Sequence, residues 1–450
     1  MRHIAFEVLC DVAERDAYAN LALPARLRGL SSRDAAFVTE LVAGTLRMQG
    51  KYDAIIDAVA RRGVSDPRTR IVLRLGVHQL LSMRTPNHAA ISETVNLQRR
   101  YVSPRTTGFV NGVLRTVSRT DNWDEVLRQQ AKTPDAALAT LHSHPEWIVR
   151  ALRTALAAEG AAAELEDLLA ADNRAPKVNL ALLGSEDLEQ DLIASLAPEI
   201  SPEGLSPIGW VLEGGSPEAV SDQLEGFCYP RVQDQGSQLA ALALVAARPL
   251  EPGEQWLDLC AGPGGKTAVL AEAAQSADIA LRANEVTPHR ADLVRQAVPE
   301  DRHDVDVVCF DGRDEAAFAR EDGNSYDRIL VDAPCTGLGA LRRRPEARWR
   351  KTPEDIPELT ALQFELLSAA VEHLKPGGLV AYVTCSPHLA ETVGVVSRVA
   401  KRDDVEILDT VSVLNGVTRE PLESGAGPHV QLWPHRHGTD AMFISLLQRV

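Results

Sequence analysis

The first 120 residues carry apolar side chains at helical spacing. Ala5, Val8, Leu9 and Val12 follow the i, i+3, i+4, i+7 spacing of one helix face. Similar stripes recur over residues 33–47, 52–63, 69–83 and 88–101, while Ser31, Ser32 and Asp34 offer caps and Pro67 and Pro86 interrupt the run. These patterns predict an all-α domain over residues 1–140.

The middle of the chain mixes two patterns. An Ala-rich helical stretch covers residues 154–172, and short strand-like runs cover residues 177–183 and 209–214. This mixture predicts linker helices and a small α+β module over residues 141–230.

From Gly253 onward, apolar strand-like runs alternate with helical segments. Alternation of this kind predicts a parallel, doubly wound sheet, hence an α/β Rossmann-like domain over residues 231–450, with ligands at the carboxyl ends of its strands. The strand-like runs are residues 255–261, 279–286, 304–310, 326–334 and 378–386.

Length and composition agree with a globular, multidomain protein. A chain of 450 residues suits two or three domains, and 45% hydrophobic with 24% charged residues is ordinary globular composition. No apolar run reaches the roughly 18 residues that span a bilayer, and the first residues do not resemble a signal peptide. Cysteines at 10, 228, 260, 309, 335 and 385 form no Cys-x-x-Cys pair, which favours a reducing cytoplasm over disulfides or a structural zinc site.

The charge is unevenly distributed. Residues 1–150 hold 21 Lys/Arg and 15 Asp/Glu, a balance of +6, whereas the whole chain carries −16. The remaining 300 residues therefore carry −22. This asymmetry indicates that the N-terminal part is the one suited to face a polyanion.

A glycine-rich turn follows the first strand of the predicted sheet. It fails the P-loop pattern because Cys260 stands where the first glycine belongs, and it fails the dinucleotide pattern because Thr267 replaces the third glycine. Two interpretations of this turn are left: a nucleoside-binding loop of the S-adenosylmethionine type, or a tight turn without a ligand. The loop comprises Cys260, Ala261, Gly262, Pro263, Gly264, Gly265 and Lys266.

Acidic residues end the next two strands. Glu285 suits hydrogen bonds with ribose hydroxyls, and Asp311 suits an adenine amino group. Either could instead cap the following helix, but two acids in register with the glycine loop favour a nucleoside.

Two cysteines end the fourth and fifth strands. Cys335 follows Asp332, and Cys385 lies in Thr-Cys-Ser. A lone buried cysteine is usually inert, but a pair beside a cofactor loop suggests nucleophilic chemistry. Carbon 5 of a pyrimidine is a poor nucleophile, and addition of a thiolate at carbon 6 activates it.

These motifs resemble those of RNA cytosine-5 methyltransferases of the Sun/Nop2/NSUN family, particularly bacterial enzymes that act on small-subunit ribosomal RNA. The similarity rests on residues 257–267, 332–350 and 383–393, with a matching lead-in at 232–244. The first 130 residues resemble the NusB-like helical domain found in front of some members.

The resemblance implies roles for individual residues. Cys385 corresponds to the nucleophile that attacks carbon 6, and Cys335 to the cysteine that assists proton removal and enzyme release. Asp332 corresponds to an acid that contacts the cytosine near the cofactor. The loop 260–266, with Glu285 and Asp311, corresponds to the S-adenosylmethionine site, and Lys266 also reaches toward the base.

The chain departs from the family pattern in three places. Gly262 stands where a second alanine is usual, Glu285 replaces the commoner aspartate, and Thr336 begins a Thr-Gly-Leu-Gly stretch where Ser-x-x-Gly is common. None of these changes removes a catalytic group, and the longer acid can still bind a ribose.

A basic run follows Cys335 directly. Its plain reading is a solvated helix face, but its place beside the expected base pocket favours RNA phosphate binding, with Trp349 stacking on a base. The RNA-binding candidates are Lys266, Arg342, Arg343, Arg344, Arg348 and Arg350. Two His-x-His pairs, at 142/144 and 435/437, lack further ligands, so no metal site is expected.

The combined expectation is a monomeric, S-adenosylmethionine-dependent cytosine-5 methyltransferase of small-subunit ribosomal RNA, without membrane or metal partners. Alternatives are methylation of another RNA such as tRNA, methylation of an exocyclic nitrogen, or a NusB-like RNA-binding assembly factor with an inactive catalytic half. The sequence Asp332-Ala333-Pro334-Cys335 lacks the Asn/Asp-Pro-Pro-aromatic motif of the amine-modifying enzymes, and the intact cysteines oppose the inactive reading.

Overall fold

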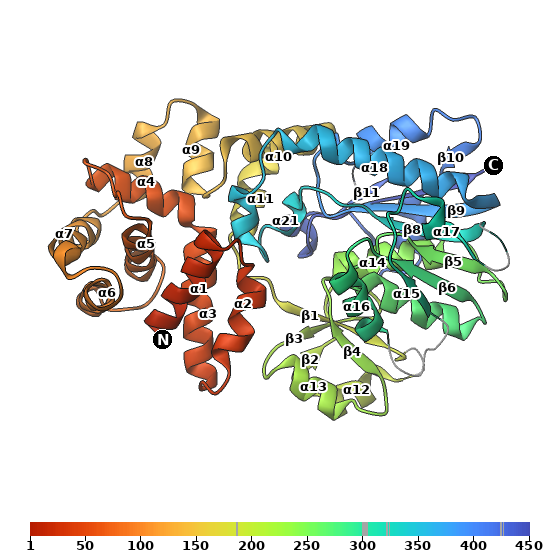
Figure 1. Cartoon of the computed structure of the whole chain (residues 1–450), viewed down its shortest axis with the longest axis horizontal. Coiled ribbons are helices and arrows are strands. Elements are labelled where there is room, and N and C mark those ends of the chain that lie inside the picture. Colours follow the sequence, from red (N-terminus) through yellow and green to blue (C-terminus); the bar gives the residue numbers. More distant parts are fainter. Residues whose placement is uncertain (186–187, 299–304, 321–322, 324, 424, 426) are drawn as a thin grey trace. The chain divides into compact units, whose positions relative to one another are not determined.

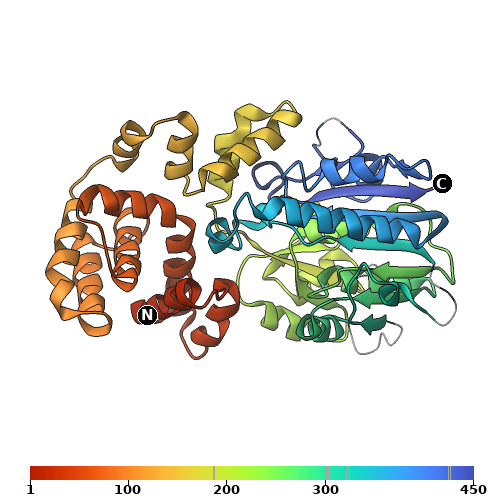
Figure 2. The same cartoon turned by 45° about the horizontal axis from the view of Figure 1, so that its top comes forward.

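The chain forms two compact units in a computed structural model (Figures 1 and 2). The structure describes residues 1–185, 188–298, 305–320, 323, 325–423, 425 and 427–450. The helical unit comprises residues 1–154, 162–175 and 341–351, and the sheet unit comprises residues 155–161, 176–340 and 352–450. The three predicted domains remain a proposal about chain organisation.

Helices make up the first unit, as the hydrophobic spacing predicts. Ser31 caps one of them by accepting from the Asp34 amide, and Asp66 caps another by accepting from the amides of Arg68 and Thr69. The elements are α1 (Arg2–Glu14), α2 (Ala19–Leu27), α3 (Ser32–Arg47), α4 (Gln49–Val59), α5 (Pro67–Leu81), α6 (Asn87–Tyr101), η1 (Pro104–Thr106), α7 (Thr107–Val117), α8 (Trp123–Gln130), α9 (Pro134–Leu141), α10 (Glu146–Ala158), η2 (Ala162–Glu164), α11 (Leu165–Ala171) and η4 (Pro345–Trp349).

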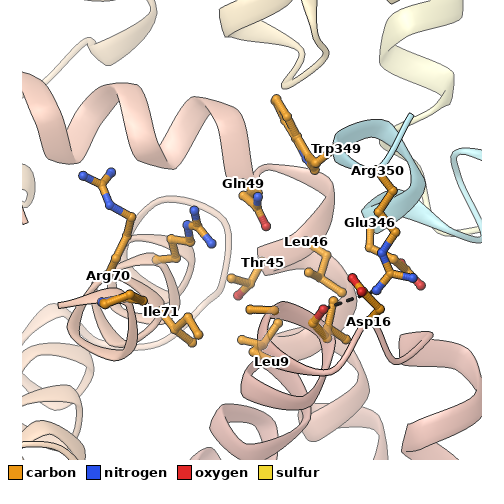
Figure 3. Close-up of a pocket in the computed structure, with 14 residues that line it drawn as sticks. Leu9, Asp16, Thr45, Leu46, Gln49, Arg70, Ile71, Glu346, Trp349 and Arg350 are labelled. Carbon is orange, nitrogen blue, oxygen red and sulfur yellow. Dashed lines mark hydrogen bonds between the residues drawn. The ribbon is translucent and has the colours of Figure 1, made fainter. Parts of the chain in front are cut away.

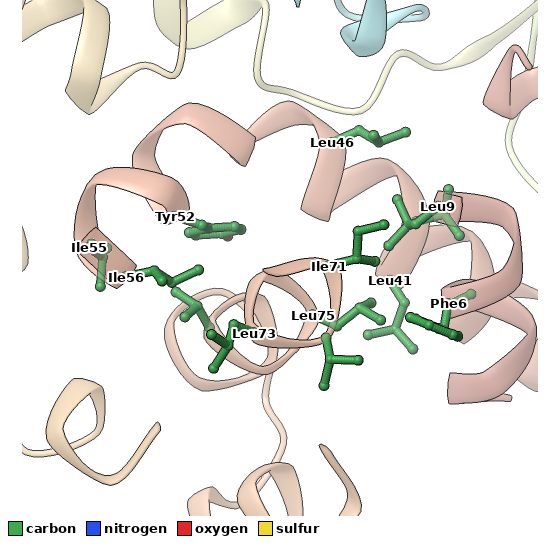
Figure 4. Packing of buried hydrophobic residues seen from close by; sticks show 14 of the residues in the cluster. Phe6, Leu9, Leu41, Leu46, Tyr52, Ile55, Ile56, Ile71, Leu73 and Leu75 are labelled. Carbon is green, nitrogen blue, oxygen red and sulfur yellow. The ribbon is translucent and has the colours of Figure 1, made fainter. Parts of the chain in front are cut away.

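The core of this unit surrounds α5. Ile71, Leu73 and Leu75 of α5 are at most 3% exposed and pack with Leu41 of α3 and Ile55 of α4 (Figure 4). Burial of these faces, more than helix propensity, stabilises helices of this length.

A large mixed sheet forms the second unit, in the order β10-β12-β9-β8-β5-β6-β7, with β11 paired to β12. The strands from β9 to β7 along this order are parallel. The five predicted strand-like runs thus form a parallel sheet as expected, and the strands β10, β11 and β12, which the sequence analysis did not identify, add an antiparallel edge, because β12 runs antiparallel to β9 and β10. Apolar runs mark strands but do not encode their direction. The strands are β5 (Gln255–Asp258), β6 (Ala280–Asn284), β7 (Val305–Val308), β8 (Tyr326–Asp332), β9 (Leu374–Thr384), β10 (Val405–Ile407), β11 (Val430–Gln431) and β12 (Phe443–Arg449).

Helices pack around this sheet. Those that follow β5, β6 and β8 connect parallel neighbours, as in a doubly wound fold. No described helix is long and apolar enough to cross a membrane. The helical elements are α14 (Gln235–Ala246), α15 (Gly265–Ser276), α16 (Pro288–Ala297), α17 (Glu315–Phe318), η3 (Leu338–Ala340), α18 (Asp355–Glu372), α19 (Val393–Val399), α20 (Thr410–Asn415) and α21 (Pro434–His437).

A small antiparallel sheet, ordered β2-β3-β1-β4, belongs to the same unit. Ala181 and Leu183 of β1 lie in one hydrophobic core with Leu239 of α14 and Leu270 of α15. The small module therefore shares its core with the large sheet. Its elements are β1 (Val178–Leu183), α12 (Gln190–Leu196), β2 (Ile200–Ser201), β3 (Gly209–Leu212), α13 (Pro217–Gln223) and β4 (Tyr229–Val232).

Candidate active site

The glycine-rich loop lies between β5 and α15. Gly264 has φ +100°, a left-handed conformation that glycine adopts without a steric penalty. An added Cβ there would lie 2.3 Å from the Ala297 Cβ, so α16 packs closely against the turn. The loop amides supply hydrogen-bond donors and the nearby carboxylates supply acceptors, as a nucleoside with an amino-acid tail requires.

Glu285 lies at the end of β6 and is 3% exposed. Its Oε2 accepts from the Gly262 amide at 3.1 Å and pairs with Arg290 Nη1 at 3.2 Å, while Oε1 accepts from the Thr287 amide at 3.0 Å. Arg290 also donates to the Gly262 carbonyl at 2.6 Å. The acid is thereby held against the glycine loop.

Asp311 follows β7 and is tied to its neighbour Arg313. The Arg313 guanidinium donates to both Asp311 carboxylate oxygens, at 2.9 and 2.7 Å, and this contact lowers the pKa of Asp311. Asn284 braces the same edge: its side chain donates to the Leu259 and Phe310 carbonyls, each at 3.1 Å.

Lys266 and Asp332 form an ion pair across the site, with Nζ and Oδ2 2.8 Å apart. Burial acts to lower the pKa of Lys266, but the charge and hydrogen bond of Asp332, together with the charges of Cys385 and Asp258, raise the pKa overall. Asp258, at the end of β5, is a residue that the sequence argument did not select. Burial raises its pKa to about 7 despite a hydrogen bond from Thr267, and its Oδ1 lacks a hydrogen-bond partner among the described residues.

The two predicted cysteines meet at the carboxyl edge of β8 and β9. Cys335 Sγ and Cys385 Sγ are 3.4 Å apart, because the parallel register sets Asp332 beside Val383. A hydrogen bond from Cys335 lowers the pKa of Cys385, and the same contact, with burial, raises the pKa of Cys335 well above its usual range. Of the two thiols, Cys385 is therefore the more easily deprotonated.

The basic run belongs to the helical unit. RNA contact requires exposed side chains, but some arginines of this run are buried. Arg348 is fully buried: its guanidinium donates to the carbonyls of Arg47, Ser143 and Asp172 and to Asn173 Oδ1, at 2.8 to 3.0 Å. The prediction that Arg348 contacts phosphate is thus incompatible with its burial.

The other arginines of the run are placed differently. Arg342 is 6% exposed, which also opposes phosphate contact, whereas Arg343 and Arg344 are exposed. Arg350 donates to the Ala17 carbonyl at 2.7 Å. RNA contact by Arg343, Arg344 and Arg350 stays a proposal.

A cavity of about 340 Å³ lies beside this run within the helical unit (Figure 3). Trp349 and Arg350 line it together with Leu9, Leu46 and Ile71. Arg70 and Arg74 also line it, and both pair with Asp53. In the part of the chain that the structure describes, no group of three or more His, Cys, Asp or Glu side chains is arranged to hold a metal ion.

Comparison with known proteins decides the family. A family model described as 16S rRNA methyltransferase RsmB/F matches residues 245–448, and the NusB family model matches residues 1–119. A ribosomal RNA small subunit methyltransferase B of Erwinia tasmaniensis (strain DSM 17950) is 31% identical, with 99% of this chain and 98% of that protein covered. The chain belongs to the RsmB/F methyltransferase family. A putative methyltransferase of Mycobacterium tuberculosis (strain H37Rv) is 46% identical, with 100% and 96% covered.

Solved structures show the same fold for this RsmB/F member. The crystal structure of PH0851 has a TM-score of 0.76 at 23% identity and covers 99% of this chain and 97% of that one. NSun6 from Pyrococcus horikoshii, solved with the S-adenosylmethionine analogue SFG, has a TM-score of 0.51 at 17% identity, with 67% and 98% covered. The predicted fold class, family and S-adenosylmethionine cofactor are confirmed, and the individual site residues remain proposals.

Proposed function

We propose that this chain methylates carbon 5 of a cytosine in small-subunit ribosomal RNA, as a cytoplasmic monomer, through a covalent bond between Cys385 and carbon 6. The observation that carries the proposal is the pair of sulfurs 3.4 Å apart, at the strand ends beside the glycine loop. The names of relatives that act on small-subunit ribosomal RNA support the substrate.

The cofactor site consists of residues 260–266 with Glu285 and Asp311. Loop amides and the Glu285 carboxylate suit the ribose, and Asp311 suits the adenine. When bound, S-adenosylmethionine supplies an electrophilic methyl group.

Cys385 begins the reaction as the nucleophile. Its thiolate adds to carbon 6, which makes carbon 5 nucleophilic. To Asp332, which Lys266 holds by a hydrogen bond of 2.8 Å, we assign the bond to the pyrimidine edge that favours charge delocalised toward nitrogen 3. The base must leave any helical stack to reach both groups, so a flipped or single-stranded cytosine is the substrate.

Cys335 assists the second half of the reaction. While Cys385 is a thiolate, its hydrogen bond and charge contribute to the raised pKa of Cys335. Once Cys385 is a thioether, both effects disappear, and Cys335 becomes easier to deprotonate. It then assists loss of the carbon 5 proton, after which Cys385 leaves as a thiolate.

The test is methyl transfer from labelled S-adenosylmethionine to unmodified small-subunit ribosomal RNA, followed by nucleoside analysis. We expect label in 5-methylcytidine, none with Cys385→Ala, and a covalent RNA adduct with Cys335→Ala on a denaturing gel. Label in another nucleoside would reject the thiolate mechanism. A Cys335→Ala enzyme that turns over normally without an adduct would reject the role of Cys335.

A further inference from the structure

The two cysteine-bearing loops are joined by one buried carboxylate that the sequence analysis did not single out. Glu391 lies between β9 and α19 and is fully buried. Its Oε1 accepts from the Thr336 amide at 2.8 Å, and its Oε2 accepts from the Thr336 hydroxyl at 2.5 Å and the Ser386 hydroxyl at 2.6 Å. Thr336 directly follows Cys335, and Ser386 directly follows Cys385.

A fourth donor completes the arrangement. Gln363 of α18 donates to Glu391 Oε1 at 3.1 Å and to the Pro334 carbonyl at 2.8 Å. The Thr336 and Ser386 hydroxyl oxygens are themselves 3.1 Å apart. Burying a carboxylate is costly unless hydrogen-bond donors surround it. The buried Glu391 carboxylate is therefore stable only while its donors stay in place, and this fixes the geometry of the donors.

A main-chain contact also joins these loops in the part of the chain that the structure describes. The Gly339 amide donates to the Cys385 carbonyl at 2.8 Å, a main-chain bond that side-chain substitution leaves in place. The charge of Glu391 also adds to the effects that raise the pKa of Cys335, after those of Cys385 and burial.

We propose that Glu391 is a positioning residue: by bonding the residue that follows each cysteine, it sets the separation of the Cys335 and Cys385 sulfurs. The importance of this separation for methylation rests on the proposed function, but the separation itself is measurable without RNA.

The geometric test is oxidation of the full-length protein with diamide. Diamide takes two electrons and two protons from the thiol pair and becomes its hydrazine, while the sulfurs close from 3.4 Å to a bond of about 2 Å. Peptide mapping by mass spectrometry measures the rate of Cys335–Cys385 disulfide formation. We expect Glu391→Gln to slow it about 10- to 100-fold, because an amide nitrogen would face a donor where an oxygen now accepts.

Glu254→Gln is the matched control. Glu254 is 4% exposed and accepts from Arg328, Trp256 and Arg248, so it is equally a buried, multiply bonded carboxylate of the sheet unit, but it contacts neither cysteine loop. It should lower stability yet leave the disulfide rate unchanged. Ser386→Ala removes one donor and keeps Glu391, so it should slow disulfide formation severalfold. This variant replaces Glu391→Gln in the test if Glu391→Gln does not fold.

Activity separates this inference from the proposed function. With Glu391→Gln, kcat for methylation should fall at least tenfold, while the Kd for S-adenosylmethionine stays within twofold of wild type. Wild-type disulfide rates in both Glu391→Gln and Ser386→Ala, or equal slowing by Glu254→Gln, would overturn the positioning role. If wild type makes no 5-methylcytidine but the disulfide rates differ as expected, the proposed function fails and the positioning role stands.

Discussion

Two departures from the family pattern are linked at the residue scale. An added Cβ at Gly262 would lie 2.2 Å from Glu285 Oε2. The usual alanine at this position therefore conflicts with the longer acid, and the missing methyl group makes room for it. The sequence shows both changes, but their coupling depends on a contact between β6 and the loop, which sequence spacing does not reveal.

A double-mutant cycle tests this coupling. Gly262→Ala should raise the Kd for S-adenosylmethionine about 10- to 100-fold, since overpacking in such a site costs about 1–3 kcal/mol. Adding Glu285→Asp to Gly262→Ala should recover most of the loss, although Glu285→Asp alone weakens binding. Titration calorimetry measures all four proteins, and additive effects would contradict the coupling.

Asp258 should make stability depend on pH. Its pKa is raised from 3.8 to about 7 by burial, so between these values the folded chain keeps a proton that the unfolded chain has lost. The resulting stabilisation is complete below pH 3.8 and is lost as the pH rises to about 7. Asp258→Asn stays neutral and can still accept from Thr267.

We therefore expect the unfolding free energy of Asp258→Asn, relative to wild type, to rise with pH up to about 7 and then level off. The full change is roughly 4 kcal/mol over this range. Urea unfolding of both proteins at several pH values between 5 and 8 covers the upper part of the rise. A difference that does not vary with pH would show that Asp258 is not the titrating group.

At the scale of elements, the segment 341–351 shows where the sequence argument failed. A run of arginines is usually exposed, but whether one of them inserts among helices depends on contacts with Arg47 and with residues 143 and 172–173, distant in the sequence. The strand ends, by contrast, were predictable, because parallel connections place them at one edge.

Arg348→Met should destabilise the helical unit by about 3 kcal/mol, because it leaves buried carbonyls without donors. Arg344 is exposed and stacks on Tyr18 at 5.6 Å, so Arg344→Ala should cost less than about 1 kcal/mol. Thermal unfolding compares the two variants, with S-adenosylmethionine binding expected to stay intact in both. Equal stability of Arg348→Met and wild type would contradict the structural role of Arg348.

For the whole molecule, hydrophobic spacing predicted the helical first part and the α/β last part, but not how the chain divides. The Ala-rich stretch 154–172 contributes to both units, and residues 341–351 join the helical unit although strands precede and follow them. The unit to which a segment belongs depends on which hydrophobic core its buried side chains join. The spacing of hydrophobic residues within the segment does not contain that information.

The division predicts how fragments behave. Residues 176–450 keep both sheets and should bind S-adenosylmethionine with a Kd within a few-fold of the full chain. Residues 231–450 lose Ala181 and Leu183 from the shared core, and should unfold at lower temperature or aggregate.

In the fragment 176–450, residues 341–351 lack the carbonyl partners of Arg348. Trypsin should therefore cut readily after Arg342 and Arg348 in this fragment, whereas in the full chain both side chains are buried and these two sites should resist cleavage. Mass spectrometry of timed digests locates the cuts. Equal resistance to trypsin at these two sites in both proteins would mean that residues 341–351 fold without the helical unit. The segment would then belong to the sheet unit, like the residues before and after it in the sequence.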